Sequence, residues 1–262
     1  MMAAAANAED WQSRTRLLIG EDAAALLQKK TVAVLGLGGV GSFAAEALAR
    51  SGIGHLILID GDRIQPSNLN RQLFALHSVL GKEKVFAAAK RLRDINPELK
   101  ITAYPEFYRP ENALGFGLDQ ADYIVDAADM VSAKIDLAVR AREKGIPLIS
   151  AMGAGNKLNP EKLRLADLSE TKICPLARVM RKELRKRGIR HLKVVYSEET
   201  ARKVQAGKND AGSGANEGRR KAAIGSMIFV PGAAGLRLAG AVIEDLIREA
   251  DKSGEEQPGR GA

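Results

Sequence analysis

The chain has 262 residues, of which 45% are hydrophobic and 27% charged, a composition that excludes intrinsic disorder and collagen-like repeats. Its single cysteine, Cys174, excludes an internal disulfide and any zinc site built from several cysteines, and it favours a reducing compartment. The net charge is +8, and residues 157–221 alone hold 18 basic and 8 acidic residues, so we expect an anionic partner at that segment.

The first part of the sequence alternates short apolar runs with helical patterns. After a helical arm at 13–28, apolar runs typical of buried strands occur at 31–35, 55–59, 100–105, 123–126 and 147–151. Helical spacing occurs at 42–51, 82–95 and 132–144. Strands that alternate with helices predict an α/β fold with a Rossmann-like, doubly wound and mostly parallel sheet.

The pattern changes after residue 155. Strands are predicted at 163–167 and 192–196, a very basic helix at 174–186, a polar loop at 200–220 and a closing helix at 226–250. The last helix carries Arg237, Glu244 and Asp245, which argue against a membrane span. We therefore expect a cytoplasmic protein, and leave peripheral membrane contact open.

A glycine-rich turn joins the first strand to the following helix. It contains Gly36, Gly38, Gly39 and Gly41, which permit a tight turn and let backbone N–H groups approach phosphate. Asp60 lies 19 residues beyond Gly41, where a carboxylate can reach ribose hydroxyls. The alternative is that the glycines serve strand–helix packing alone, but strand, turn, helix and acid in this order favour a nucleotide site.

A polar stretch after the second strand indicates which nucleotide would bind. It holds Asp62, Ser67, Asn68, Asn70, Arg71 and Gln72, and Lys84 follows at the next helix. A nicotinamide ring needs an apolar slot, whereas a triphosphate needs cations for its phosphates. The residues favour ATP, with a solvated polar loop as the alternative.

Together these motifs resemble the ubiquitin-activating (ThiF/MoeB/HesA) superfamily, whose members adenylate carboxylates with ATP and Mg²⁺. The resemblance covers residues 16–155 and implies that the glycine turn, Asp60, Asp62 and the polar stretch bind ATP. It implies catalytic roles for Arg16, Arg71, Lys84 and Asp129. Arg71 and Lys84 would hold phosphates, Asp129 would coordinate Mg²⁺, and Arg16 would be an arginine finger supplied across a homodimer interface. The chain departs from the family at Met130, where asparagine is usual.

The later segments 150–157, 174–184, 194–197 and 225–227 resemble one branch, the tRNA threonylcarbamoyladenosine dehydratases. This implies ATP-dependent cyclisation of threonylcarbamoyladenosine near the tRNA anticodon. It also implies a single ThiF-like domain, with an ATP-binding part at 13–155, a basic substrate-binding part at 156–250 and a flexible tail at 251–262. The alternatives are an activator of a ubiquitin-like sulfur carrier, which a single cysteine without Cys-x-x-Cys pairs disfavours, and a non-enzymatic nucleotide-binding module.

Two further features concern the substrate. Cys174 opens the basic helix, where the helix dipole favours a thiolate, so it is a candidate nucleophile; the alternative is a small buried residue. The candidate tRNA-binding residues are Arg178, Arg181, Lys182, Arg185, Lys186 and Arg187. A charged face exposed to solvent is the alternative there. The expected partners are tRNA and a second copy of the chain, and a sulfur-transfer protein is left open.

Overall fold

The computed structural model describes residues 10–204 and 224–255, and side chains up to residue 248. Within them the strands are β1 (Thr31–Leu35), β2 (His55–Ile59), β3 (Lys100–Tyr104), β4 (Tyr123–Asp126), β5 (Leu148–Ala151), β6 (Leu163–Asp167) and β7 (Lys193–Ser197). The α-helices are α1 (Ser13–Ile19), α2 (Glu21–Leu27), α3 (Gly41–Arg50), α4 (Lys84–Ile95), α5 (Val131–Lys144), α6 (Pro175–Arg185) and α7 (Phe229–Glu255).

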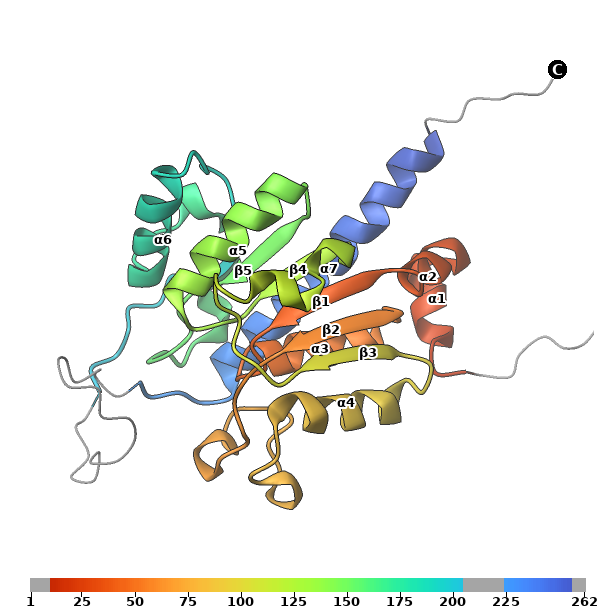
Figure 1. Ribbon diagram of the computed structural model, residues 1–262, viewed down its shortest axis with the longest axis horizontal. Helices are drawn as coiled ribbons and strands as arrows, with labels where there is room; N and C mark the ends of the chain where they lie inside the picture. The colour runs from red at the N-terminus through yellow and green to blue at the C-terminus, as the bar shows by residue number, and fades with distance from the viewer. Residues whose placement is uncertain (1–9, 205–223, 256–262) are drawn as a thin grey trace, which may run out of the picture.

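All seven strands form one sheet in the order β3-β2-β1-β4-β5-β7-β6 (Figure 1). Every neighbouring pair is parallel except β6 and β7, which are antiparallel. The predicted doubly wound, mostly parallel sheet is confirmed. The chain leaves β1 in one direction toward β2 and later returns to its other side with β4, so the carboxyl ends of β1 and β4 frame the crevice at which such sheets bind ligands.

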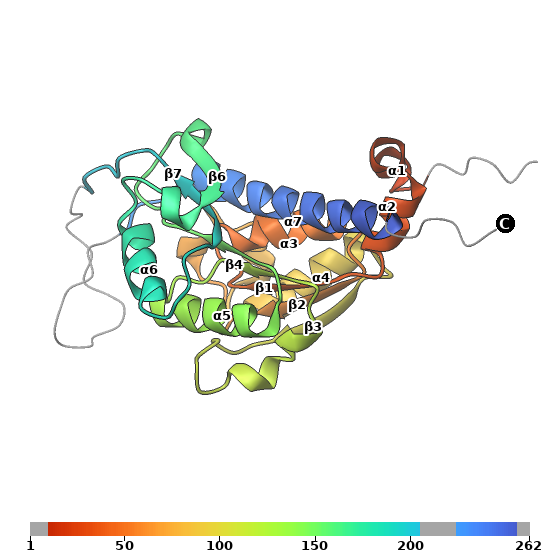
Figure 2. The same ribbon diagram turned by 90° about the horizontal axis from the view of Figure 1, so that it is seen from above.

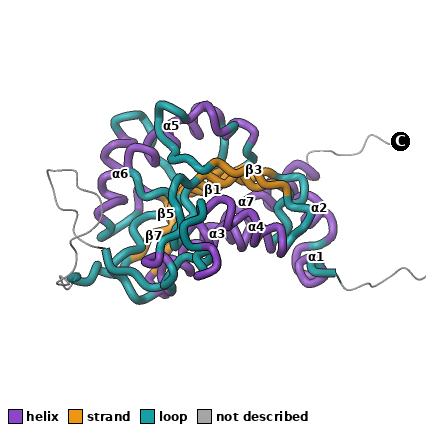
Figure 3. The backbone as a smooth tube through the Cα atoms, turned by 60° about the horizontal axis from the view of Figure 1, so that its bottom comes forward, coloured by secondary structure: helices purple, strands orange, loops and turns teal. Residues whose placement is uncertain are grey.

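Alternating side chains of the strands face two different helical layers, which Figures 2 and 3 show on opposite sides of the sheet. Val32 and Val34 of β1 belong to a buried core with α3, α4 and α7. Ala33 and Leu35 face the other side and pack with α5. Strands buried on both faces have no polar side to alternate with, which is why they appear in the sequence as continuous apolar runs.

The basic part of the chain continues the same sheet through β7 and β6. Helix α6 packs on α5 through a third core that includes Ala138, Met180 and Leu184. Helix α7 lies along α3 and buries Leu238 and Val242 completely. In the part of the chain that the structure describes, no helix combines the length and the apolar character required to cross a bilayer.

The structure differs from the predicted elements in the N-terminal arm and at the end of the last helix. The arm at 13–28 is two helices, because Gly20 adopts φ +84° and breaks the helical path. Helix α7 continues to Glu255, past the predicted start of the tail at 251. Residues 205–223, which make up most of the predicted polar loop, and residues 256–262 of the tail lie outside the described residues.

Candidate active site

A cavity of about 510 Å³ lies at the carboxyl ends of β1, β2 and β4; we call it the nucleotide pocket. The predicted residues that line it are Gly36, Gly38, Gly39, Asp60, Asp62, Asn68, Arg71, Gln72, Lys84 and Asp129. They come from segments far apart in the sequence, and the sheet brings them together. Of the other predicted ATP-binding residues, Gly41, Ser67 and Asn70 do not line the pocket but shape its walls, as described below.

The glycine turn is built by close backbone contacts. Gly36 has φ +83°, and a Cβ there would come within 2.7 Å of the carbonyl oxygen of Ala127 on the β4 side. A Cβ on Gly41, the first residue of α3, would lie 1.7 Å from the carbonyl oxygen of Gly36. Only glycine fits either position, and the turn therefore brings the amino end of α3 against the pocket, where helix N–H groups favour an anion.

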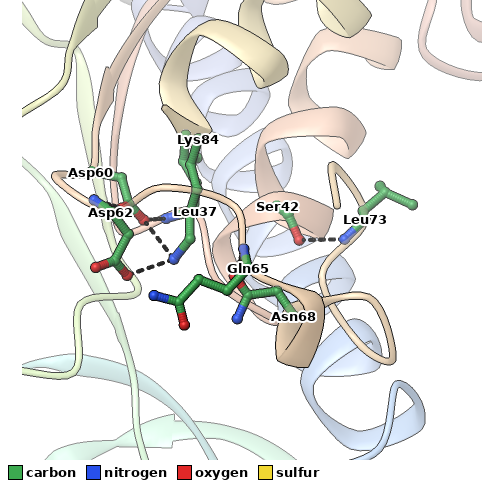
Figure 4. Close-up of polar contacts among 8 residues, drawn as sticks. All are labelled: Leu37, Ser42, Asp60, Asp62, Gln65, Asn68, Leu73 and Lys84. Atoms are coloured by element: carbon green, nitrogen blue, oxygen red, sulfur yellow. Dashed lines mark hydrogen bonds and ion pairs between the residues drawn. The ribbon is translucent and has the colours of Figure 1, made fainter. Parts of the chain in front are cut away.

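Asp60 follows β2 and is 8% exposed (Figure 4). Its carboxylate accepts hydrogen bonds from the backbone N–H of Leu37, at 2.6 Å, and of Asp62, at 2.8 Å. Burial raises the pKa of Asp60, and the positive charge of Lys84 partly opposes this rise. The two hydrogen bonds fix the carboxylate between the glycine turn and the polar stretch, the position from which it can accept bonds from ribose hydroxyls.

Lys84 is the first residue of α4 and is 4% exposed. Its Nζ lies 2.6 Å from Oδ2 of Asp62 and 3.8 Å from Oδ2 of Asp60 (Figure 4). A buried lysine requires such partners, because an unpaired ammonium group is costly to desolvate. The pocket therefore holds a buried cation that is paired with carboxylates.

The polar stretch forms a short 3-10 turn at Pro66–Asn68 beside the pocket. Asn68 accepts a hydrogen bond from the backbone N–H of Gln65 and so caps this turn. Arg71 lines the pocket, and its guanidinium donates to the carbonyl of Ser67 and to Oδ1 of Asn70. Asn70 in turn donates to the carbonyl of Ser226 just before α7. Ser67 and Asn70 thus orient Arg71.

The segment after β3 contributes pocket residues that the sequence did not predict: Glu106, Phe107 and Tyr108. Phe107 lies against Gly61, where a Cβ would meet its ring at 2.7 Å, and the guanidinium of Arg109 lies 6.0 Å from the ring centroid. Tyr108 donates a 2.7 Å hydrogen bond to Asp136 of α5. Its pKa is raised by burial and by that carboxylate. The sequence signal that could have found these residues is their position directly after a predicted strand, because the carboxyl end of such a strand faces the crevice.

Arg16 does not line the nucleotide pocket of its own chain. It lies on α1, where it forms ion pairs with Asp10 and Glu21. Helix α1 precedes β1 and lies at the amino ends of the strands (Figure 2), whereas the pocket is lined by residues at their carboxyl ends. Any contact between Arg16 and a nucleotide would therefore involve the pocket of another chain.

Cys174 caps the amino end of α6, as the sequence predicted, but its side chain is 4% exposed. Its sulfur lies 3.8 Å from the place that a Cβ atom on Gly153 would occupy. Next to it, the buried Lys157 donates to the carbonyls of Gly153 and Ser197 at 3.0 and 3.2 Å. Burial lowers the pKa of Lys157. Burial of the thiol favours the structural alternative for Cys174 over the role of nucleophile.

The basic residues of α6 divide into two groups. Arg181 donates to the carbonyls of Leu168 and Thr171, so the chain's own carbonyls already hold its guanidinium, and its role in binding RNA stays a prediction. Lys186 and Arg187 pair with Glu183. Arg178, Lys182 and Arg185 are exposed, and no described acidic side chain lies within ion-pair distance of them. We call these three the basic stripe; with Arg181 and Lys186 they line a shallow hollow of about 440 Å³.

Comparison with known proteins agrees with this geometry. The profile of the ThiF family matches residues 12–187. The chain belongs to the ThiF family. A tRNA threonylcarbamoyladenosine dehydratase from Bacillus subtilis is 42% identical over 240 residues, which cover 90% of this chain and 94% of the relative. The Escherichia coli protein of the same name is 40% identical over 178 residues, or 67% of this chain and 66% of that protein.

Solved structures of family members show the same fold. Escherichia coli tRNA N6-threonylcarbamoyladenosine dehydratase in complex with AMP superimposes with a TM-score of 0.81 at 32% identity, covering 92% of this chain and 97% of that one. The complex of the same protein with ATP gives 0.80 at 31% identity and the same coverage.

Proposed function

We propose that this chain is an ATP-dependent, adenylate-forming tRNA threonylcarbamoyladenosine dehydratase. The observation that carries the proposal is the nucleotide pocket, in which the buried Lys84 and Arg71 lie beside a glycine turn and the fixed carboxylate of Asp60. A relative of that name matches 90% of the chain, and a structure of another holds ATP. Among the alternatives, an activator of a sulfur carrier is not favoured by these relatives.

The reaction proceeds in two steps. The threonyl carboxylate of the modified adenosine attacks the α-phosphate of ATP, the bond to the β-phosphate breaks, and pyrophosphate leaves. The carbamoyl group of the same modification then attacks the acyl-adenylate, AMP leaves, and a ring closes with net loss of water. Because the second nucleophile is tethered to the first group, the protein needs chiefly to position the reactants and stabilise charge.

Each pocket residue has a place in this reaction. Asp60 receives the ribose, the glycine turn receives phosphate at the amino end of α3, and Lys84 and Arg71 neutralise the charge that develops on the phosphates. The ammonium group of Lys84 has three N–H donors, so phosphate oxygens would bind it beside the carboxylate of Asp62 or in competition with it.

The pocket fits Mg²⁺ held mainly by the nucleotide. Mg²⁺ usually keeps several waters and is bound by one or two carboxylates plus substrate phosphates. The described residues contain no group of three His, Cys, Asp or Glu side chains that could form a complete protein site. Asp129 supplies an exposed carboxylate at the pocket wall, with the thioether of Met130 beside it rather than an amide. When bound, Mg²⁺ would neutralise phosphate charge, and Asp129 would be its protein ligand.

We assign tRNA to the basic stripe. Arg178, Lys182 and Arg185 are spaced i, i+4 and i+7, so they lie along one side of α6. Unpaired cations in a row suit the phosphates of an RNA backbone, which position the RNA without reading its sequence. We place the enzyme in the cytoplasm, because its single cysteine fits a reducing compartment. We assign no surface to a sulfur-transfer protein.

We further propose a homodimer in which Arg16 reaches the partner's nucleotide pocket. Next to Arg16 on α1, Leu17 and Leu18 are 81% and 86% exposed, as expected for a helix that is covered by a second copy. Mixing two inactive variants, Arg16→Ala and Lys84→Ala, should then restore part of the activity, because each heterodimer contains one pocket with both native residues. Absence of rescue after confirmed subunit exchange would contradict the arrangement.

The choice of substrate is tested by measuring pyrophosphate release from ATP. We expect release when tRNA that carries threonylcarbamoyladenosine is added, and none with tRNA that lacks the modification. A purified ubiquitin-like carrier with a free C-terminal carboxylate serves as the competing substrate. Release with the carrier and not with modified tRNA would establish the alternative.

A further inference from the structure

A buried ion pair lies directly behind the pocket wall that carries Asp129. Lys134 of α5 and Asp126 at the end of β4 are each 1% exposed, and their Nζ and Oδ2 atoms are 3.0 Å apart. Lys134 also donates to Oγ of Ser150, at 3.2 Å, and to the carbonyl of Ala151, at 2.8 Å, both on β5. Ser150 itself donates to Asp126 at 2.5 Å. Neither charged residue lines the nucleotide pocket.

A pair buried this deeply is poorly explained by stability alone. Desolvating two charges costs free energy that their attraction often fails to recover, and well-packed apolar residues of similar volume are frequently as stable or more stable. What a buried pair with additional hydrogen bonds does provide is a single geometry, because every other arrangement leaves a charge unpaired.

The geometry that this pair fixes is that of the Asp129 loop, residues 126–130. At the start of the loop, the side chain of Lys134 binds Asp126, whose other oxygen accepts a 3.2 Å hydrogen bond from the backbone N–H of Ala128. At its end, the backbone N–H of Lys134 donates to the carbonyl of Met130 at 3.1 Å. One residue thus closes the loop from both ends, and Asp129 lies between the two attachments.

We propose that Lys134 is a positioning residue for adenylation: with Asp126 and Ser150 it holds the Asp129 loop in the place where the Asp129 carboxylate would serve as the protein ligand of Mg²⁺. This inference rests on the proposed function. It predicts that loss of the pair slows the chemical step more than it weakens ATP binding, since the residues that hold the ribose and the phosphates, Asp60 and Lys84, are attached elsewhere.

The test uses a charge-neutral double variant, Lys134→Met with Asp126→Asn, so that no buried charge is left unpaired. We expect its ATP dissociation constant to stay within about threefold of the wild type and its adenylation rate to fall by about 100-fold. Hydrogen exchange at the Asp129 loop should become faster. Ser150→Ala, which removes one neutral partner and preserves the pair, should slow adenylation in the same direction by about 3- to 10-fold, and it gives a result even if the double variant does not fold.

The control is a second Lys–Asp pair, which is less deeply buried, with side chains that are 36% and 21% exposed. Lys193 at the start of β7 and Asp245 of α7 are 2.5 Å apart, and neither belongs to the pocket. Lys193→Met with Asp245→Asn should leave the adenylation rate per folded molecule unchanged. The inference is overturned if the Lys134 variants adenylate within about twofold of wild type, or if the control loses as much activity. If Asp129→Ala also retains activity, the assignment of Asp129 itself has failed.

Discussion

The nucleotide pocket and the basic stripe both contain cations, but they hold them in opposite ways. In the pocket, Lys84 is buried and paired with Asp62 and Asp60. On α6, Arg178, Lys182 and Arg185 are exposed and have no described acidic partner within reach. Pre-paired, buried charge suits a site where a small ligand must adopt one geometry. Unpaired, exposed charge suits attraction of a large polyanion, whose phosphates need not be placed as accurately.

The largest effect on the rate of adenylation should come from a substitution in the nucleotide pocket. Replacing Asp129 with Ala should reduce adenylation roughly 100- to 1,000-fold, because it would remove the proposed protein ligand of Mg²⁺, and loss of one group that stabilises transition-state charge typically costs about this much. The thermal midpoint and tRNA affinity should not change, since the side chain is exposed and does not line the hollow of the basic stripe. Pyrophosphate release and filter binding of tRNA measure the two properties separately; a normal rate of AMP formation would remove Asp129 from the site.

The glycine turn should tolerate a methyl group at one position and not at another. Gly41→Ala should lower stability by about 3 kcal/mol or more or prevent folding, since the new methyl group would collide with the carbonyl of Gly36. Gly38→Ala is the matched control, because its Cβ would find its closest neighbour, in the side chain of Gln72, at 3.9 Å. Denaturant unfolding of both variants gives the comparison, and equal stability of the two would contradict this account of the turn.

Substitutions in the basic stripe should change tRNA binding and leave the nucleotide pocket unaffected. Changing Arg178, Lys182 and Arg185 to Glu should weaken tRNA binding by more than about tenfold, and ATP binding should remain as in wild type. Each lost phosphate contact should remove about 0.7–0.9 from the slope of log K against log salt. Titrations at several salt concentrations measure this. An unchanged affinity that is insensitive to salt would show that the stripe is only a solvated surface.

The smallest expected effect concerns the stability of the fold and involves neither the nucleotide pocket nor the basic stripe. His55 is partly buried between Thr31 and Thr102, and burial, with a smaller contribution from Lys100, lowers its pKa below 6.5. The unfolded chain therefore takes up this proton more readily, so the stabilisation present above pH 6.5 is lost as the pH falls through the folded pKa. His55→Gln should flatten the decline in melting temperature between about pH 7.5 and about pH 5.5. An unaltered pH profile would contradict this assignment.

The sequence predicted the sheet and much of the pocket for a definite reason. Strands buried on both faces leave uninterrupted apolar runs, and the turn from Gly36 to Gly41 and the acid at Asp60 have fixed spacing because covalent geometry joins them to one strand–helix–strand unit. Phe107 was missed because only the pairing of β3 with β2 brings it to Gly61. No local pattern encodes that approach.

The basic helix shows a different limit of prediction. Counting charges located the segment but could not tell which cations are already held within the chain. Arg181 is bound to carbonyls that lie 10 and 13 residues earlier in the sequence, and only the packing of α6 reveals this. The split of the arm at Gly20 was missed because an isolated glycine inside a helical pattern is often tolerated.

The paired state of Lys84 has a consequence for how the enzyme turns over. In the proposed reaction, phosphate oxygens would compete with the carboxylate of Asp62 for Lys84 as the nucleotide enters, and Asp62 would regain the ammonium group as AMP leaves. A carboxylate within reach of the same ammonium group would work against tight retention of product. Asp62 would thereby limit how long a spent nucleotide can occupy the pocket.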